Sequence, residues 1–105
     1  MNLDILSVIK GNIIVGKWRF SDHAIKKCDE RGIDIEELVI SLVQGELLED
    51  YPEDPRGHSC LLLSYIKNRP VHTVCGIDES GTVFITAYWP EEPKWIDERT
   101  RRERA

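Results

Sequence analysis

Two histidines of this sequence are suited to proton transfer near neutral pH: His23 and His72. An imidazole takes and gives protons in this range, which is what the 2′-hydroxyl and the leaving 5′-oxygen require when RNA is cleaved. Tyr88 could orient or assist such a transfer. The alternative for His23 is a local hydrogen bond at a helix start. For His72 and Tyr88 it is ordinary packing between neighbouring strands.

Four arginines are candidates for holding a phosphate. Arg31 follows His23 by eight residues on the same polar arc of one predicted helix, and its guanidinium could bind a phosphate through paired donors. The alternative for Arg31 is a bond within the following turn or an ion pair. Arg99, Arg101 and Arg102 form a basic tail that suits sequence-tolerant contact with an RNA backbone, although a solvated charge run has the same composition.

Two tryptophans precede these three arginines in the sequence. Trp89 and Trp95 could offer surfaces on which unpaired bases stack. The reading favoured by the sequence is that both wedge the tail against the sheet. His58, close to Arg56 in a glycine-containing loop, is a weaker candidate of the same kind as the other histidines.

The sequence indicates neither a metal nor a cofactor. Its three cysteines, Cys28, Cys60 and Cys75, are far apart and form no Cys-x-x-Cys motif, so we expect small buried side chains rather than a zinc site or disulfides. The glycine loops and catalytic motifs of nucleotide-dependent enzymes, serine hydrolases and zinc proteases do not occur.

Length and composition predict a single soluble domain that covers residues 1–105. Hydrophobic residues make up 41% of the chain and charged residues 31%, which is typical of globular proteins. No apolar run approaches the roughly 18 residues that span a bilayer, and the first residues do not resemble a signal peptide. We therefore expect a cytoplasmic protein without membrane contact.

Charge is unevenly distributed along the chain. The net charge is −5, from 19 acidic and 14 basic residues, which by itself does not indicate a nucleic-acid binder. Residues 94–105 nevertheless carry five basic against three acidic side chains, and residues 46–54 carry acidic side chains and no basic one. This pattern suits an anion-binding end or a charged docking surface, and an ordinary solvated surface can also produce it.

The helix that carries His23 and Arg31 has both ends defined by sequence. Ser21 or Asp22 can cap its start, and Gly32 suits the left-handed position after its end. A second helix is predicted from Asp34, with apolar residues at 35, 38, 39, 42 and 43 and a stop near Gly45. Residues 3–9 predict a further short helix that could extend to residue 14, whereas residues 13–15 suit a helix end or a strand.

Strands dominate the rest of the chain. Residues 60–66, 71–77 and 83–88 predict an antiparallel meander joined by short turns, and residues 47–51 could add a fourth strand at an edge. Residues 16–20 are expected to be extended. The predicted fold is α+β, with N-terminal helices on one face of a three- to four-stranded antiparallel sheet and a short C-terminal helix or tail. His72 and Tyr88 would then lie on the other face.

Several short motifs resemble a widespread small bacterial domain of unknown function. They are His-Ala at 23–24, Arg-Gly-Ile at 31–33, Glu-Asp-Tyr at 49–51 and the Tyr-Trp-Pro ending at 88–90, and the resemblance extends over roughly residues 18–102. That family is similar to the RelE/BrnT-like toxins. The resemblance implies a RelE-like fold, RNA cleavage, an antitoxin partner, and a substrate on the sheet face that carries His72 and Tyr88. The acidic net charge departs from the well-studied members.

Two hypotheses follow. In the first, the protein is a metal-independent, toxin-like endoribonuclease of the mRNA interferase type. His23 or His72 would transfer protons, Tyr88 would assist, and Arg31 with the tail arginines would hold RNA, either free or on the ribosome. In the second, it is a non-catalytic module that binds a partner protein through a sheet edge or the acidic segment 46–54. The sequence does not determine the oligomeric state.

Overall fold

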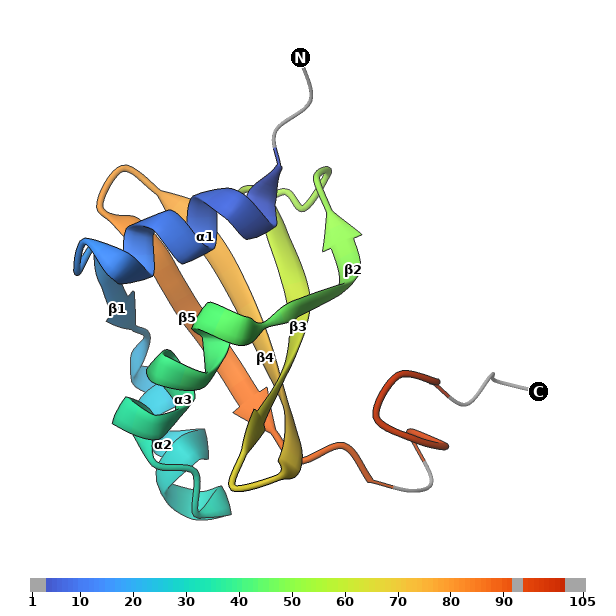
Figure 1. Cartoon of the computed structure of the whole chain (residues 1–105). Coiled ribbons are helices and arrows are strands. Elements are labelled where there is room, and N and C mark those ends of the chain that lie inside the picture. The colour runs from blue at the N-terminus through green and yellow to red at the C-terminus, as the bar shows by residue number, and fades with distance from the viewer. Residues whose placement is uncertain (1–3, 92–93, 102–105) are drawn as a thin grey trace.

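In the part of the chain that the computed structural model describes, residues 4–91 and 94–101, the helices and one short strand come first and a run of longer strands follows (Figure 1). The helices of this part are α1 (Ile5–Ile14), α2 (Asp22–Arg31) and α3 (Ile35–Ser41), which continues into the 3₁₀ turn η1 (Leu42–Gln44). Its strands are β1 (Trp18–Phe20), β2 (Glu46–Tyr51), β3 (Ser59–Ile66), β4 (Arg69–Asp78) and β5 (Gly81–Tyr88). None of the helices described is long and apolar enough to cross a membrane.

The ends of α2 and α3 follow the sequence signals. The Ser21 side chain accepts a hydrogen bond from the Ala24 amide at 3.0 Å, and Asp34 accepts one from the Glu37 amide at 2.9 Å, as N-caps do. Gly32 ends α2 with φ +67°, a left-handed conformation that a side chain disfavours. The first helix continues to Ile14, so the segment 13–15 that the sequence left open is a helix end.

The sheet is mixed, with strand order β1-β5-β4-β3-β2. Its last four strands pair antiparallel in the predicted meander, but β1 pairs parallel to β5. The prediction of a wholly antiparallel sheet of three to four strands was therefore wrong. The three residues of β1 are too few to show an alternating pattern, and β1 also separates α1 from α2, so the helices are not one N-terminal block.

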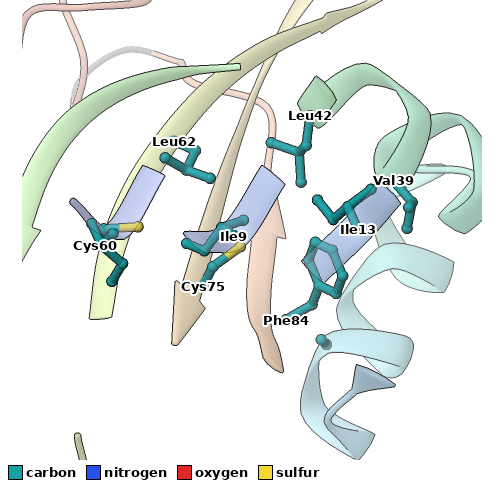
Figure 2. Packing of buried hydrophobic residues seen from close by; sticks show 10 residues of the cluster. Ile9, Ile13, Val39, Leu42, Cys60, Leu62, Cys75 and Phe84 are labelled. Carbon is teal, nitrogen blue, oxygen red and sulfur yellow. The ribbon is translucent and has the colours of Figure 1, made fainter. Parts of the chain in front are cut away.

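One face of the sheet packs against the helices (Figure 2). Ile9 and Ile13 of α1 and Leu42 of η1 share a buried cluster with Leu62 of β3 and Phe84 of β5. The three cysteines are buried on this same side. Burial raises the pKa of the Cys60 thiol to about 12, which keeps it protonated. These findings confirm the expectation of small buried cysteine side chains.

The C-terminal segment, residues 94–101, which we call the strap, lies on the other face of the sheet, where Trp95 and Glu98 contact His72 of β4. Trp95 and Arg101 form an antiparallel bridge, and the Ile96 amide donates to the Thr100 carbonyl at 2.8 Å. The strap is thus a tight hairpin-like loop and not the C-terminal helix that was one of the two expectations. Leu61 and Leu63 of β3, which alternate with Leu62 of the helix-side cluster, are both 1% exposed.

Candidate functional site

His72 of β4 is fully buried beneath the strap. Its Nδ1 lies 3.2 Å from the hydroxyl of Tyr88 on β5, and its Nε2 lies 2.6 Å from the main-chain carbonyl oxygen of Glu98. The ring of Trp95 stands edge-on to the imidazole, with centroids 4.3 Å apart and planes at 88°. One histidine is therefore enclosed by a strand neighbour and by two residues of the strap.

These contacts define the protonation of the imidazole. A carbonyl oxygen only accepts hydrogen bonds, so His72 Nε2 must carry the hydrogen. Burial lowers the pKa of His72, which favours the neutral ring. In a neutral ring with Nε2 protonated, Nδ1 is bare and accepts the hydrogen bond from the Tyr88 hydroxyl.

Tyr88 connects this buried imidazole with the surface. Burial raises the pKa of the Tyr88 phenol, so the phenol carries its proton at neutral pH. Its side chain lines a pocket of about 390 Å³ between α2, the end of β5 and the strap. A phenol that faces a pocket and has a base behind it can exchange protons with a bound molecule.

The same pocket is rich in cations. Arg31, Lys94 and Arg101 line it, against one acidic residue, Glu91. Arg31 donates from Nη1 to the Ala87 carbonyl at 2.7 Å, which draws the guanidinium from the end of α2 toward β5. Such a group of cations beside a phenol suits an anion such as a carboxylate or a phosphate.

Trp89 forms an aromatic wall of this pocket. Its indole nitrogen donates to the Arg31 carbonyl at 2.7 Å, and the guanidinium of Arg69 lies 3.8 Å from its ring centroid. The ring is therefore held from two sides. A base could stack on its remaining surface.

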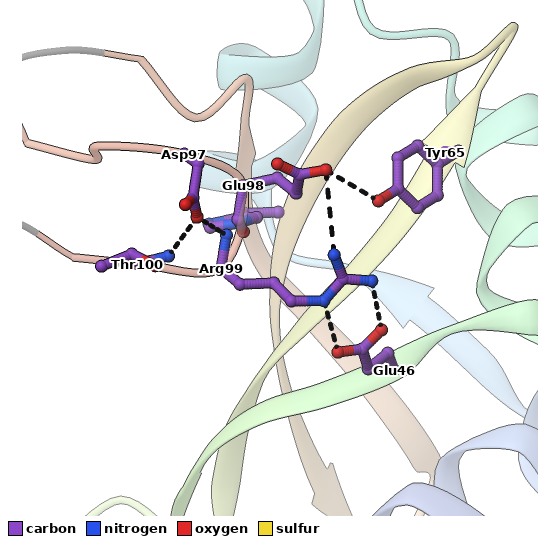
Figure 3. Close-up of polar contacts among 7 residues, drawn as sticks. Glu46, Tyr65, Asp97, Glu98, Arg99 and Thr100 are labelled. Carbon is purple, nitrogen blue, oxygen red and sulfur yellow. Dashed lines mark hydrogen bonds and ion pairs between the residues drawn. The ribbon is translucent and has the colours of Figure 1, made fainter.

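The arginines of the strap are paired with acidic residues of β2, and Figure 3 shows the pair of Arg99 and Glu46. Arg99 makes two bonds of 2.9 Å to the Glu46 carboxylate, and Arg101 approaches Glu49 to 3.0 Å. The two oppositely charged segments of the sequence thus meet in the fold. Of the predicted RNA-binding arginines, Arg101 reaches the pocket, Arg99 is engaged with β2, and Arg102 lies outside the described residues.

His23 is separate from this group. It is exposed at the start of α2, and eight residues of helix place it roughly 12 Å along the axis from Arg31. Within the described chain, the His23 side chain makes no hydrogen bond or ion pair. The structure therefore brings together Arg31, His72, Tyr88 and Arg101 from the predicted set and leaves His23 apart.

Comparison with known proteins identifies the family. A family model described as a domain of unknown function, DUF4258, matches residues 20–89. The chain belongs to this family. The match includes Arg31, His72 and Tyr88, whereas the strap lies beyond it. No curated protein and no solved structure matches the chain, so the likeness of this DUF4258 protein to RelE or BrnT toxins stays a prediction.

Three contributors to the site were not predicted from the sequence. Lys94 lines the pocket, Glu98 contributes only its main-chain carbonyl, and Trp95 was considered for stacking or wedging rather than for a contact with His72. Trp95 is 2% exposed and does wedge the strap against the sheet. A main-chain carbonyl has no sequence signature, so Glu98 could not have been found.

A second polar group of this DUF4258 domain lies at the other end of the sheet. His58 Nε2 is 2.5 Å from Asp50, while Asp54 accepts bonds from Arg56 and Ser59. These bonds hold the pKa of Asp54 down at about 2. The group is internally paired. Across the described residues, no three His, Cys, Asp or Glu side chains are arranged to hold a metal ion.

Proposed function

We propose that this DUF4258 protein is a metal-independent endoribonuclease of the mRNA interferase type, acting at the pocket between α2, β5 and the strap. The observation that carries the proposal is the hydrogen bond between the Tyr88 hydroxyl and the bare Nδ1 of His72, 3.2 Å long, at the wall of a cationic pocket. This arrangement provides a proton acceptor and phosphate-binding groups in one place.

The cleavage step uses the RNA 2′-hydroxyl as nucleophile. Its proton passes to the Tyr88 oxygen while the Tyr88 proton passes to His72 Nδ1. The 2′-oxygen forms a bond to phosphorus, the bond from phosphorus to the 5′-oxygen breaks, and water gives a proton to that oxygen. The proton on His72 then returns through Tyr88 to the solvent. The products are a 2′,3′-cyclic phosphate and a 5′-hydroxyl.

Arg31, Lys94 and Arg101 would bind the phosphate and offset the charge that develops on it. Cations placed in advance stabilise such charge without reorganising, so the mechanism does not call for a metal ion. A base next to the cleaved bond would stack on Trp89. Specificity for unpaired RNA would follow, because bases in a duplex are not free to stack on protein.

The acidic net charge is compatible with this proposal. Glu46 and Glu49 are neutralised by Arg99 and Arg101. With Arg101 counted against Glu49, the pocket still holds Arg31 and Lys94, and its acidic residue, Glu91, pairs with Arg69. RNA responds to the local potential near the pocket more than to the total charge, because exposed charges beyond about 8 Å are largely screened at physiological salt.

The test is cleavage of an unstructured RNA by the purified protein in the presence of a chelator. We expect products with a 5′-hydroxyl end, and we expect Tyr88→Phe to slow cleavage by a factor on the order of 100 or more. Expression of the wild type but not of Tyr88→Phe should arrest bacterial growth. If RNA and translating ribosomes both stay intact with the wild-type protein, the proposal is wrong.

A second candidate is a non-catalytic module that binds a partner protein, such as an antitoxin. It is favoured by large apolar side chains on the helices, since Ile14 is 71% and Ile40 is 70% exposed. Substituting both with Lys should abolish a complex detected by co-purification without affecting RNA. Growth arrest that depends on Tyr88 would argue against a purely non-catalytic role.

A further inference from the structure

The strap contributes to the candidate site as well as covering it. We infer that Trp95 and the Glu98 main-chain carbonyl are positioning groups, which hold His72 in the Nε2-protonated form with its Nδ1 directed at Tyr88. The inference rests on the proposed function for its catalytic meaning. Its structural content, the state of one imidazole, can be measured without RNA.

Because the Glu98 carbonyl can only accept a hydrogen bond, a single tautomer of the neutral imidazole gives both ring nitrogens a hydrogen-bond partner. With Nε2 donating to Glu98 at 2.6 Å, Nδ1 is left to accept from Tyr88. The opposite tautomer would place two acceptors, Nε2 and the carbonyl oxygen, against each other. A buried polar group without a partner is unfavourable, so the strap selects one tautomer.

Trp95 prevents the ring from leaving this orientation. Its indole packs edge-on against the imidazole, with the ring centroids 4.3 Å apart, and Trp95 is itself almost fully buried. The indole nitrogen is buried without a hydrogen-bond partner among the described residues. Burial raises the pKa of the Tyr88 phenol, and Arg101 and then Trp95 lower it, which is the effect that a donor beside the phenol oxygen has. This N–H is available to that oxygen while the Tyr88 proton moves to His72.

The strap is tied to the sheet at its other end by polar contacts. Arg99 pairs with Glu46, and the Tyr65 hydroxyl donates to the Glu98 side chain at 3.2 Å (Figure 3). Arg101 pairs with Glu49. These contacts are partly exposed and screened by solvent, so each contributes little. The buried Trp95 is therefore the principal anchor, and its substitution should release His72.

The experiment is nitrogen NMR of the histidine side chains in the labelled full-length protein, with pH titration. In the wild type, His72 should show a single Nε2-protonated tautomer, a slowly exchanging Nε2 proton, and a titration midpoint below the ordinary value. Trp95→Ala should produce a tautomer mixture, loss of the slow proton, and a midpoint shifted upward. Charged and titratable groups that face His72 are Glu49 of β2, Tyr88 of β5, and Glu98 and Arg101 of the strap.

Two variants serve as controls. Ile96→Ala alters an exposed residue of the same strap and should leave the His72 signals unchanged. Trp95→Phe keeps an aromatic ring but removes the N–H, so the tautomer should persist while RNA cleavage slows and its pH profile shifts. The backbone amide spectrum of the helix-side core shows that each variant is folded.

The inference is overturned if wild-type His72 carries its hydrogen on Nδ1, or if folded Trp95→Ala leaves the tautomer and titration unchanged. These results are independent of catalysis. A wild-type protein that shows the expected imidazole but cleaves no RNA would refute the proposed function and leave the positioning role intact. If the wild type cleaves RNA but Trp95→Ala leaves the His72 tautomer and titration unchanged, the positioning role is refuted and the proposed function stands.

Discussion

The two faces of the sheet are built in different ways. The face toward the helices is a continuous apolar layer in which α1, α2 and α3 bury Leu62, Cys75 and Phe84. The opposite face carries Glu46, Glu49, His72 and Tyr88 and is covered by one short strap, fastened by a buried indole and by ion pairs. Both faces are covered, but only one presents groups that transfer protons or bind anions.

This difference separates stability from chemistry. An apolar layer gains free energy from burial in proportion to its area, and it does not need particular hydrogen bonds. The polar face needs each partner in place, because a buried donor or acceptor without one is destabilising. Substitutions on the helix side should therefore change folding, and substitutions on the strap side should change function with smaller effects on folding.

The largest expected effect comes from the helix side. Leu62→Ala removes a fully buried side chain from the core and should lower the free energy of unfolding by about 3 kcal/mol, measured by urea denaturation. The matched variant is Tyr65→Ala on the same strand, whose side chain is 44% exposed and points to the strap side. If Tyr65→Ala destabilises the protein as much as Leu62→Ala does, the claim that the helix side contributes more to stability than the strap side is wrong.

The next effect is on RNA affinity. Arg31→Ala removes a guanidinium from the pocket, and loss of a charge-assisted contact worth roughly 1.5 to 3 kcal/mol should weaken binding of a short RNA about tenfold or more. Lys26→Ala is the control, because Lys26 is exposed on the same helix but lines a different hollow. Equal losses for both variants would mean that binding depends on general charge and not on the pocket.

Protonation of His72 on the strap side should lower the free energy of unfolding in acid. The pKa of His72 is lowered by burial, so between its unfolded value near 6.5 and its folded value the unfolded chain binds more protons. Stability therefore falls as the pH drops below about 6.5. Urea denaturation at pH 8 and pH 5 should show this loss in the wild type and in His23→Ala, and much less of it in His72→Asn. If His72→Asn loses as much stability between pH 8 and pH 5 as the wild type does, the titration of His72 is not the cause of the loss.

The smallest effect concerns the fastening of the strap. Arg101 and Glu49 are 45% and 29% exposed at their side chains, so solvent screens the pair. A double-mutant cycle of Arg101→Ala and Glu49→Ala should give a coupling energy below about 1 kcal/mol. A coupling of several kcal/mol would show that ion pairs, rather than Trp95, anchor the strap.

Sequence reasoning was most accurate where structure is local. Caps at Ser21 and Asp34 and the left-handed Gly32 are properties of neighbouring residues, and the structure confirms them. The parallel pairing of β1 with β5 depends on contacts about 60 residues apart, and three residues carry too little pattern to reveal it. Residues 13–15 form an equally short segment, and the sequence therefore left open whether they end a helix or form a strand.

The candidate site shows the same division. His72 and Tyr88 were expected together on the face opposite the helices, and the structure places them there. Strict alternation along β5 would put Phe84 on the face of Tyr88, but Phe84 lies in the helix-side cluster because the register of β4 and β5 shifts between Val74 and Cys75. The pairing of strap arginines with β2 joins segments about 50 residues apart, and their charges alone do not specify a contact. His23 was selected for its chemistry, but its place on α2 keeps it away from the strap.

The central claim is that ligands of this DUF4258 protein bind on the strap side, at the pocket of Arg31, Tyr88 and Lys94. Amide and side-chain NMR shifts during titration with a short unstructured RNA test it most directly. The account predicts that the signals of Arg31, Trp89 and Lys94 move first and that those of Ile14 and Ile40 do not. Shifts confined to the helix side, or an unchanged spectrum at saturating RNA, would contradict it.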